Sequence, residues 1–184
     1  MAIYQMVDME TLGQIPLAAV FSIGGVFFHP SKRQLYSEFY MLINPQSCID
    51  LGMISQQDTL DWWEKQSPEA RKELDRSFSE GQDIKFAIGE YFKYLKDGSR
   101  NFGGVNEIRM MSNGADFDLP ILTVAAHLTG QTLPWKFWNN RCFRTLKNMK
   151  KVPEPKRDGV FHNALDDAIH QARWCCDIVE RMKD

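Results

Sequence analysis

The chain has 184 residues, of which 43% are hydrophobic and 25% are charged, and its formal net charge is −2. This composition is ordinary for a folded globular protein and argues against a surface that is basic throughout. A chain of this length is most simply one domain, which covers residues 1–184.

The N-terminus and the cysteines predict where the protein works. No basic segment followed by a long apolar one opens the chain, so no signal peptide is predicted. No apolar run reaches about 18 residues, which predicts that no segment crosses a membrane. The four cysteines form no Cys-x-x-Cys pair, so they are expected to be reduced thiols of a cytoplasmic protein without zinc or disulfides.

Three β-prone segments come first in the chain. The first strand is expected near residues 6–13, and residues 15–28 form a continuous apolar run that predicts a buried strand. Two adjacent glycines at 24–25 indicate a bulge in that strand. Residues 34–43 are rich in Tyr, Phe and Leu and predict a third strand. Because the connections are short, the three strands are expected to form an antiparallel meander.

The middle of the chain has helical periodicity. Residues 56–66 predict a helix, and a second one begins at Ser67, with Pro in its first position and Glu in its first turn. Residues 83–96 predict an amphipathic helix, with Asp83 as its cap and residues 97–98 as its end.

Strands and helices then alternate. A strand is predicted at 106–112, followed by a helix at 117–129. A last short strand is expected at 141–146, a loop at 152–159 and a final helix at 163–182. The order of elements predicts an α/β fold in which helices flank a central mixed sheet.

Asp8 and Glu10 stand two residues apart in the first strand. Their side chains therefore point to the same face, with Cβ atoms roughly 6–7 Å apart, within reach of a common ion. The alternative is a solvent-facing strip on an edge strand, and this pair alone does not decide between the two.

Two later segments each offer two acids, and helical geometry separates them. Steps of one turn from Asp118 lead to a mostly buried line of side chains, whereas steps from Asp116 lead to a more polar one. Asp118 is also well placed to cap its helix. By the same test Asp167 faces inward in the final helix, and Asp166 faces solvent.

Four inward carboxylates are thus predicted, on the first strand and at the starts of two helices. If they converge, they form a cluster of hard oxygen ligands suited to Mg²⁺ or Mn²⁺. Without a cation such a cluster would repel itself.

With these motifs the chain resembles the DEDDh family of 3′→5′ exonucleases, which have a ribonuclease H-like fold. Residues 58–67 and 134–145 resemble segments of the bacteriophage-type group within that family. The motifs are Asp8-Met-Glu10-Thr, Asn-Gly-Ala-Asp-Phe-Asp118 and His162-Asn-Ala-Leu-Asp-Asp167-Ala. The similarity extends from about Val7 to Arg173, although Asp116 leaves two candidates for the second motif. The resemblance implies a mixed sheet of five or six strands and hydrolysis of nucleic acid, DNA or RNA, from a free 3′ end.

The resemblance also implies roles for individual residues. Two divalent ions, Mg²⁺ or Mn²⁺, would be held by Asp8, Glu10, Asp118 and Asp167, as two-metal phosphodiester hydrolysis requires. His162, on the loop before the final helix, would accept a proton from the attacking water. Substrate contacts are expected from Thr11, Asn113, Phe117 and Arg141.

Other features favour a nucleic-acid partner less specifically. Eight basic residues and one acid lie between residues 136 and 157, which suits either a phosphate-bearing strand or a solvated loop. Trp62, Trp63, Phe137 and Trp138 would stack on bases or belong to the core. Two alternative functions stay open: a non-catalytic nucleic-acid-binding module of the same fold, and another metal-dependent phosphohydrolase. A phage-encoded protein would act in the host cytoplasm.

Overall fold

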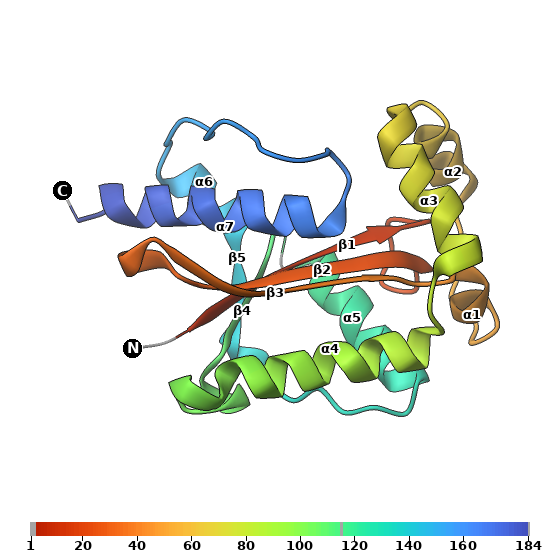
Figure 1. Ribbon diagram of the computed structural model, residues 1–184, viewed down its shortest axis with the longest axis horizontal. Helices are drawn as coiled ribbons and strands as arrows, with labels where there is room; N and C mark the ends of the chain where they lie inside the picture. The colour runs from red at the N-terminus through yellow and green to blue at the C-terminus, as the bar shows by residue number, and fades with distance from the viewer. Residues whose placement is uncertain (1–2, 115, 184) are drawn as a thin grey trace.

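The computed structural model describes residues 3–114 and 116–183. It contains a five-stranded sheet in the order β3-β2-β1-β4-β5 (Figure 1). The strands are β1 (Tyr4–Thr11), β2 (Val20–His29), β3 (Gln34–Leu42), β4 (Arg109–Ser112) and β5 (Asn140–Cys142). β2 is antiparallel to both β1 and β3, whereas β4 pairs with β1 and β5 with β4 in parallel. The prediction of a mixed sheet that begins with a meander is confirmed.

Helices cover both faces of the sheet. They are α1 (Pro45–Ile49), α2 (Gln57–Trp63), α3 (Pro68–Glu80), α4 (Ile84–Ser99), α5 (Asp118–Leu128), α6 (Phe143–Met149) and α7 (Ala164–Arg181). Figure 1 shows α6 and α7 on one face and α4 on the other, with α2 and α3 beyond the end of β1. Within the described ranges, no helix has the length and apolar character needed to cross a membrane.

The alternation of side chains along β1 divides them between two cores. Val7 and Met9 belong to the larger core, which contains residues of α4 and α5. Met6 belongs to a second core on the other face, with Ala168 and Ala172 of α7. Because successive residues of a strand alternate, the even-numbered Asp8 and Glu10 share the face of Met6 and lie under α7.

The predicted strand at 15–28 is too long, and its bulge is wrong. β2 begins only at Val20, and it pairs with β1 in register through both glycines. A Cβ on Gly24 would lie 2.2 Å from the backbone carbon of Ala164. Gly24 therefore serves close packing, because it lets the first turn of α7 rest directly on the sheet.

Three other boundaries differ from the sequence prediction. The strand expected at 141–146 ends at Cys142, where the Cys142 Sγ accepts a bond from the Thr145 amide and α6 begins. The α4 helix continues past 97–98 because Gly98 fits against the Phe27 ring, 2.3 Å from where a Cβ would stand. The short helix α1, capped by Asn44, was missed. The predicted caps Ser67 and Asp83 are confirmed.

Candidate active site

The first two acids lie on the central strand of the sheet. β1 is hydrogen-bonded to β2 on one side and to β4 on the other, so the alternative of a solvent-facing edge strand is wrong. Glu10 is buried, with 8% of its surface exposed, and Asp8 is partly buried. This strand therefore presents both carboxylates to the space beneath α7.

Asp118 reaches the same space from the start of α5. It is 3% exposed, and its Oδ1 accepts a hydrogen bond of 3.1 Å from the Met9 amide of β1. The predicted capping role is wrong, because Phe117 occupies the N-cap position and Asp118 is the first helical residue. Its carboxylate instead joins α5 to the strand that carries the other acids. Asp116 is exposed and does not line the cavity described below.

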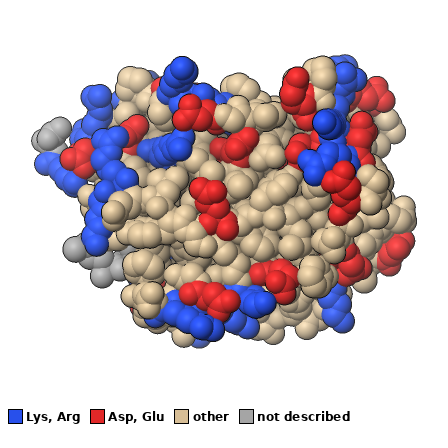
Figure 2. Space-filling model, viewed as in Figure 1, with Lys and Arg blue, Asp and Glu red and all other residues tan. Residues whose placement is uncertain are grey.

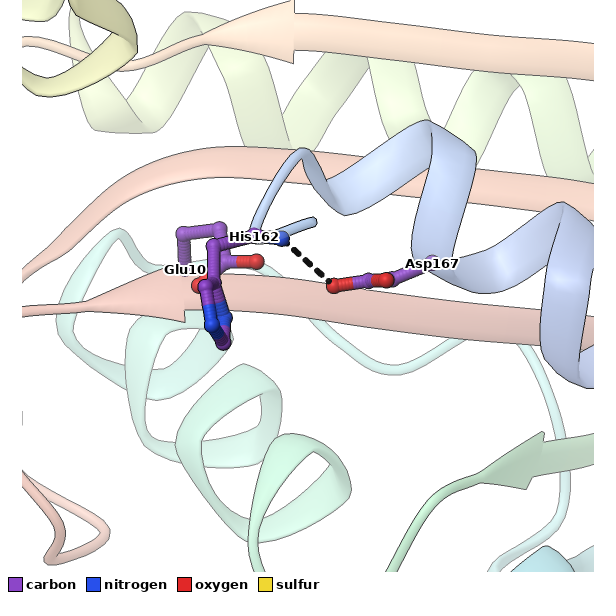
Figure 3. Close-up of side chains that lie close together, drawn as sticks. All are labelled: Glu10, His162 and Asp167. Carbon is purple, nitrogen blue, oxygen red and sulfur yellow. Dashed lines mark hydrogen bonds between the residues drawn. The ribbon is translucent and has the colours of Figure 1, made fainter. Parts of the chain in front are cut away.

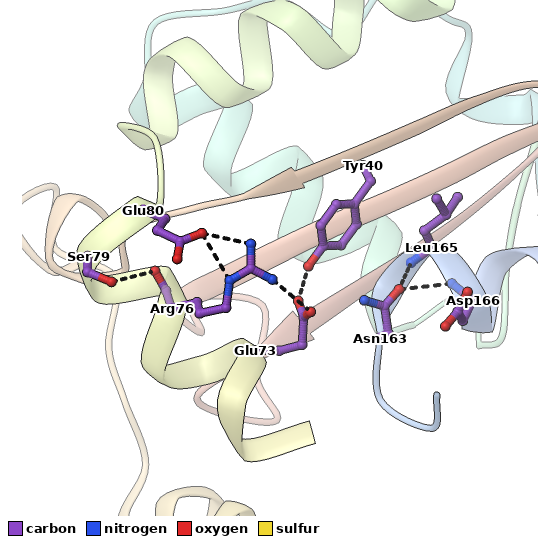
Figure 4. A network of polar contacts seen from close by, with 8 residues as sticks. All are labelled: Tyr40, Glu73, Arg76, Ser79, Glu80, Asn163, Leu165 and Asp166. Carbon is purple, nitrogen blue, oxygen red and sulfur yellow. Dashed lines mark hydrogen bonds and ion pairs between the residues drawn. The ribbon is translucent and has the colours of Figure 1, made fainter. Parts of the chain in front are cut away.

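Asp167 comes from the first turn of α7. Asn163 caps this helix by accepting bonds of 3.1 Å from the Leu165 and Asp166 amides (Figure 4). One turn beyond Asp167, the Gln171 side chain donates a hydrogen bond of 2.7 Å from Nε2 to Asp8 Oδ1. Gln171 was not predicted as a site residue, although its position one helical step from Asp167 was the available signal.

The loop before α7 is attached to the first turn of that helix. The Arg157 guanidinium forms a short ion pair with Asp167 Oδ1, and the His162 amide donates a bond of 3.1 Å to Asp167 Oδ2. Asp166 Oδ2 accepts a bond of 2.7 Å from the Val160 amide, which accounts for its turning away from the cavity. Arg157 was not predicted here, because a loop residue has no periodicity that would assign it to a face.

His162 is held over the acids by this loop. Its φ of +62° lies in the left-handed region, which allows the loop to turn back over the sheet. Glu10, His162 and Asp167 each offer a ligand atom within 4.8 Å of the others, and Figure 3 shows them side by side. The imidazole packs edge-on against Trp62 and Trp63, with ring centroids 4.9 and 5.8 Å away.

Burial and mutual repulsion perturb the carboxylates. Burial raises the pKa of Asp8 and of Glu10 well above their usual range, and the neighbouring carboxylates raise both further. Burial also raises the pKa of Asp118 to about 7, although the hydrogen bond from the Met9 amide acts to lower it. Glu73 of α3, which accepts a hydrogen bond from the Tyr40 hydroxyl (Figure 4), adds to the repulsion on Glu10.

One cavity of about 380 Å³ is lined by the four acids and by the groups that contact them, namely Arg157, His162 and Gln171. Of the predicted substrate contacts, Asn113 and Phe117 line it as well. Thr11 and Arg141 do not: the Thr11 hydroxyl donates to the Gly13 carbonyl, 2.7 Å away, and Arg141 borders a second cavity of about 610 Å³. The positive side chains in the wall of the first cavity are Arg144, Lys147 and Arg157.

The side chains of this cavity fit divalent cations. Four carboxylates from three elements supply hard oxygen donors, the type of ligand that Mg²⁺ and Mn²⁺ take. The buried Gln171 Oε1 has no hydrogen-bond partner among the described residues, and burial together with mutual repulsion raises the pKa of Asp8 and of Glu10. A bound cation would offset this repulsion.

Solved structures share this fold. The chain resembles the nuclease domain of 3′hExo, a DEDDh family member solved with rAMP, with a TM-score of 0.65, 13% identity, and coverage of 98% of this chain and 92% of that one. It resembles exonuclease I of E. coli, solved with a dA16 oligonucleotide, with a TM-score of 0.70 and 11% identity. That match covers 100% of this chain and 42% of the other.

Sequence comparisons also find exonucleases. A curated relative, the exodeoxyribonuclease of enterobacteria phage T4, is 28% identical over 193 aligned positions, covering 88% of this chain and 82% of that protein. The family model and this relative define a 3′→5′ exonuclease. The chain belongs to the family described as the 3′-5′ exoribonuclease Rv2179c-like domain, whose family model matches residues 4–179.

Proposed function

We propose that the chain is a metal-dependent 3′→5′ exonuclease that releases mononucleotides from the 3′ end of DNA, and of RNA as a second substrate. The observation that carries this proposal is the meeting of Asp8, Glu10, Asp118 and Asp167 with His162 in one cavity. The name of the phage relative supports DNA, and the family description supports RNA.

The four carboxylates would hold two divalent cations, Mg²⁺ or Mn²⁺. Such ions stabilise the charge that develops on the attacking and leaving oxygens of an in-line displacement. Gln171 orients Asp8 through its amide, and the Met9 amide orients Asp118, so both carboxylates are held in place by neighbours on other elements.

His162 is the proposed general base. Burial lowers the pKa of its imidazole, although Asp167 partly opposes this, so the ring is neutral near pH 7 and a ring nitrogen is ready to accept a proton. Trp62 and Trp63 contact the ring and restrict its orientation. The proton would come from the water that attacks the terminal phosphodiester.

The same cavity would bind the end of the strand. Asn113 and Phe117 lie where they would contact the terminal nucleotide, and Arg144 and Lys147 bring positive charge towards its phosphates. Thr11 lies outside this cavity and its hydroxyl is bonded to the Gly13 carbonyl, so no contact with the terminal nucleotide is assigned to it. We also propose that residues 1–184 act as one exonuclease domain in the cytoplasm, which the buried thiols Cys48, Cys175 and Cys176 support.

A panel of DNA and RNA strands, labelled at either end and incubated with Mg²⁺, Mn²⁺ or chelator, tests this function. We expect stepwise shortening from the 3′ end that requires the metal and is lost in Asp8→Ala, while circular dichroism shows that the variant keeps its fold. Internal cuts would indicate another phosphohydrolase. Binding without cleavage would indicate a non-catalytic module, and unchanged activity of Asp8→Ala would refute the carboxylate cluster.

A further inference from the structure

Two aromatic side chains stand in solvent outside the active-site cavity. Phe137 is 73% exposed and Trp138 is 61% exposed, on the short 3₁₀ turn Phe137–Asn139 before β5. Their ring centroids lie 5.0 Å apart at an interplanar angle of 79°, and the Lys136 Nζ lies 5.8 Å from the Trp138 ring. Exposed neighbouring aromatics of this size mark interaction sites, since burying them releases free energy.

The turn that carries this pair is anchored from beneath. Asn139 is 4% exposed; its Nδ2 donates a bond of 2.8 Å to the Asn106 carbonyl, and its Oδ1 accepts a bond from Arg109. Arg141 donates to the Trp138 carbonyl at 2.9 Å. Because these contacts fix the backbone, the two rings are presented in a set orientation, which lowers the entropic cost of binding.

In the segment of the chain around the aromatic pair, all the charged side chains are positive. Residues 119–153 contain six lysines and arginines and neither aspartate nor glutamate. This segment also forms one wall of the active-site cavity through Phe143, Arg144 and Lys147. It therefore leads from the catalytic cavity, along the edge strand β5, to the aromatic pair.

We propose that Phe137 and Trp138 form a second contact for a single-stranded nucleic-acid substrate, 5′ of the nucleotide being removed. Bases would stack on the two rings while Lys136 and Arg141 contact phosphates, the combination by which proteins bind single strands without reading their sequence. The inference rests on the proposed exonuclease function and adds to it a site that holds the strand between successive cuts.

The test compares a trinucleotide, which reaches only the catalytic cavity, with a strand of about 15 nucleotides. Affinities of the double variant Phe137→Ser/Trp138→Ser are measured by fluorescence anisotropy in chelator, and hydrolysis is measured separately in Mg²⁺. We expect about 10- to 100-fold weaker binding of the long strand, since stacking contributes at this scale per base. Trinucleotide binding and hydrolysis should equal those of the wild type.

The matched control is Phe78→Ser/Phe86→Ser, which removes two rings that are 53% and 52% exposed on α3 and α4. It should keep wild-type affinity for both strands, and thermal melts should show both variants folded. The proposal would be overturned if the Phe137→Ser/Trp138→Ser variant lost the same affinity for both strand lengths, or lost affinity for neither. It would also be overturned if the wild type were a dimer that only this variant converts to a monomer. If the wild type left the trinucleotide intact, the exonuclease function would fail instead.

Discussion

Asp167 accepts a contact at each of its carboxylate oxygens. Oδ1 is paired with the Arg157 guanidinium, and Oδ2 accepts the bond from the His162 amide. The Arg157 Cζ lies 4.1 Å from the centroid of the Phe161 ring, and this contact helps to keep the guanidinium beside Asp167. One carboxylate therefore holds the loop that carries His162, and a cation bound at Asp167 would compete with Arg157 for Oδ1.

Replacing Arg157 with Ala should strengthen divalent-metal binding. The change removes a positive charge and frees Asp167 Oδ1, so we expect roughly tenfold tighter Mn²⁺ binding, or about 1.4 kcal/mol. Isothermal titration calorimetry measures this directly. Arg173→Ala, which breaks the exposed pair with Asp158, is the control and should leave the affinity unchanged. Weaker binding in Arg157→Ala would contradict the competition.

His162→Ala should separate catalysis from metal binding. Loss of a general base costs about 10²–10⁴ in rate, so kcat should fall by that factor. Mn²⁺ affinity should be retained, because the four carboxylates remain. A variant that lost both would show that His162 is itself a ligand, which its distance to Glu10 and Asp167, within 4.8 Å, also permits.

The position of α7 relative to the sheet decides whether Asp167 and Gln171 reach Asp8. Gly24 sets this position, because the backbone of Ala164 lies where its Cβ would be. In the same row across the sheet, Tyr40 of β3 pairs with Gly24 and donates a hydrogen bond to Glu73 of α3, which lies near the α7 N-cap Asn163 in Figure 4. The site thus depends on how tightly two helices approach the meander.

Gly24→Ala should push α7 away from β2. Overpacking of this kind costs about 1–3 kcal/mol, so the melting temperature should fall, and metal affinity should fall with it. Gly89→Ala is the matched control: the nearest atom to a Cβ there is Gln131 Oε1 at 3.6 Å, and α4 should gain about 0.5–1 kcal/mol. Differential scanning calorimetry measures both. Equal melting temperatures would contradict the packing argument.

Charge is distributed unevenly over the whole molecule despite a net charge of −2. Figure 2 shows lysines and arginines gathered near the C-terminal end of α7, both signs mixed over α2 and α3 and along α4, and mainly acids in the middle of the face. This face therefore offers no continuous basic surface to a phosphate backbone. The buried acids, in contrast, concentrate negative charge inside the molecule, which makes its stability depend on pH.

Without metal, the protein should lose stability as pH rises. The pKa of Asp118 is about 7 in the folded state and near 3.8 in the unfolded chain, so the folded state holds a proton that the unfolded state has released. The stabilisation is complete below the lower value and is lost as pH passes through about 7, with an upper limit of roughly 4 kcal/mol for this group.

Urea unfolding in chelator at about pH 5 and about pH 8 measures the part of this loss that falls between these two pH values. Asp118→Asn should reduce the difference between the two pH values, and added Mg²⁺ should restore stability at the higher pH, because the cation binds the ionised acids. A wild-type protein that is equally stable at both pH values would exclude the expected linkage.

Local periodicity was sufficient to choose between neighbouring acids. Strand alternation placed Asp8 and Glu10 on one face, and helical steps selected Asp118 and Asp167 over Asp116 and Asp166, because the face of a residue follows from its own element. The meander and the order of the longer helices and strands were predictable for the same reason, whereas the short helices α1 and α6 and boundaries such as the end of β5 were not.

Contacts between distant segments were decided only when the chain packed. Gln171 and Asp8 are 163 positions apart, and the pairing of Arg157 with Asp167 depends on how a loop without periodicity turns back. The two glycines of β2 look like a bulge in the sequence, and only the approach of Ala164 shows that Gly24 serves packing. Such contacts depend on which surfaces meet, and no pattern within a single element contains that information.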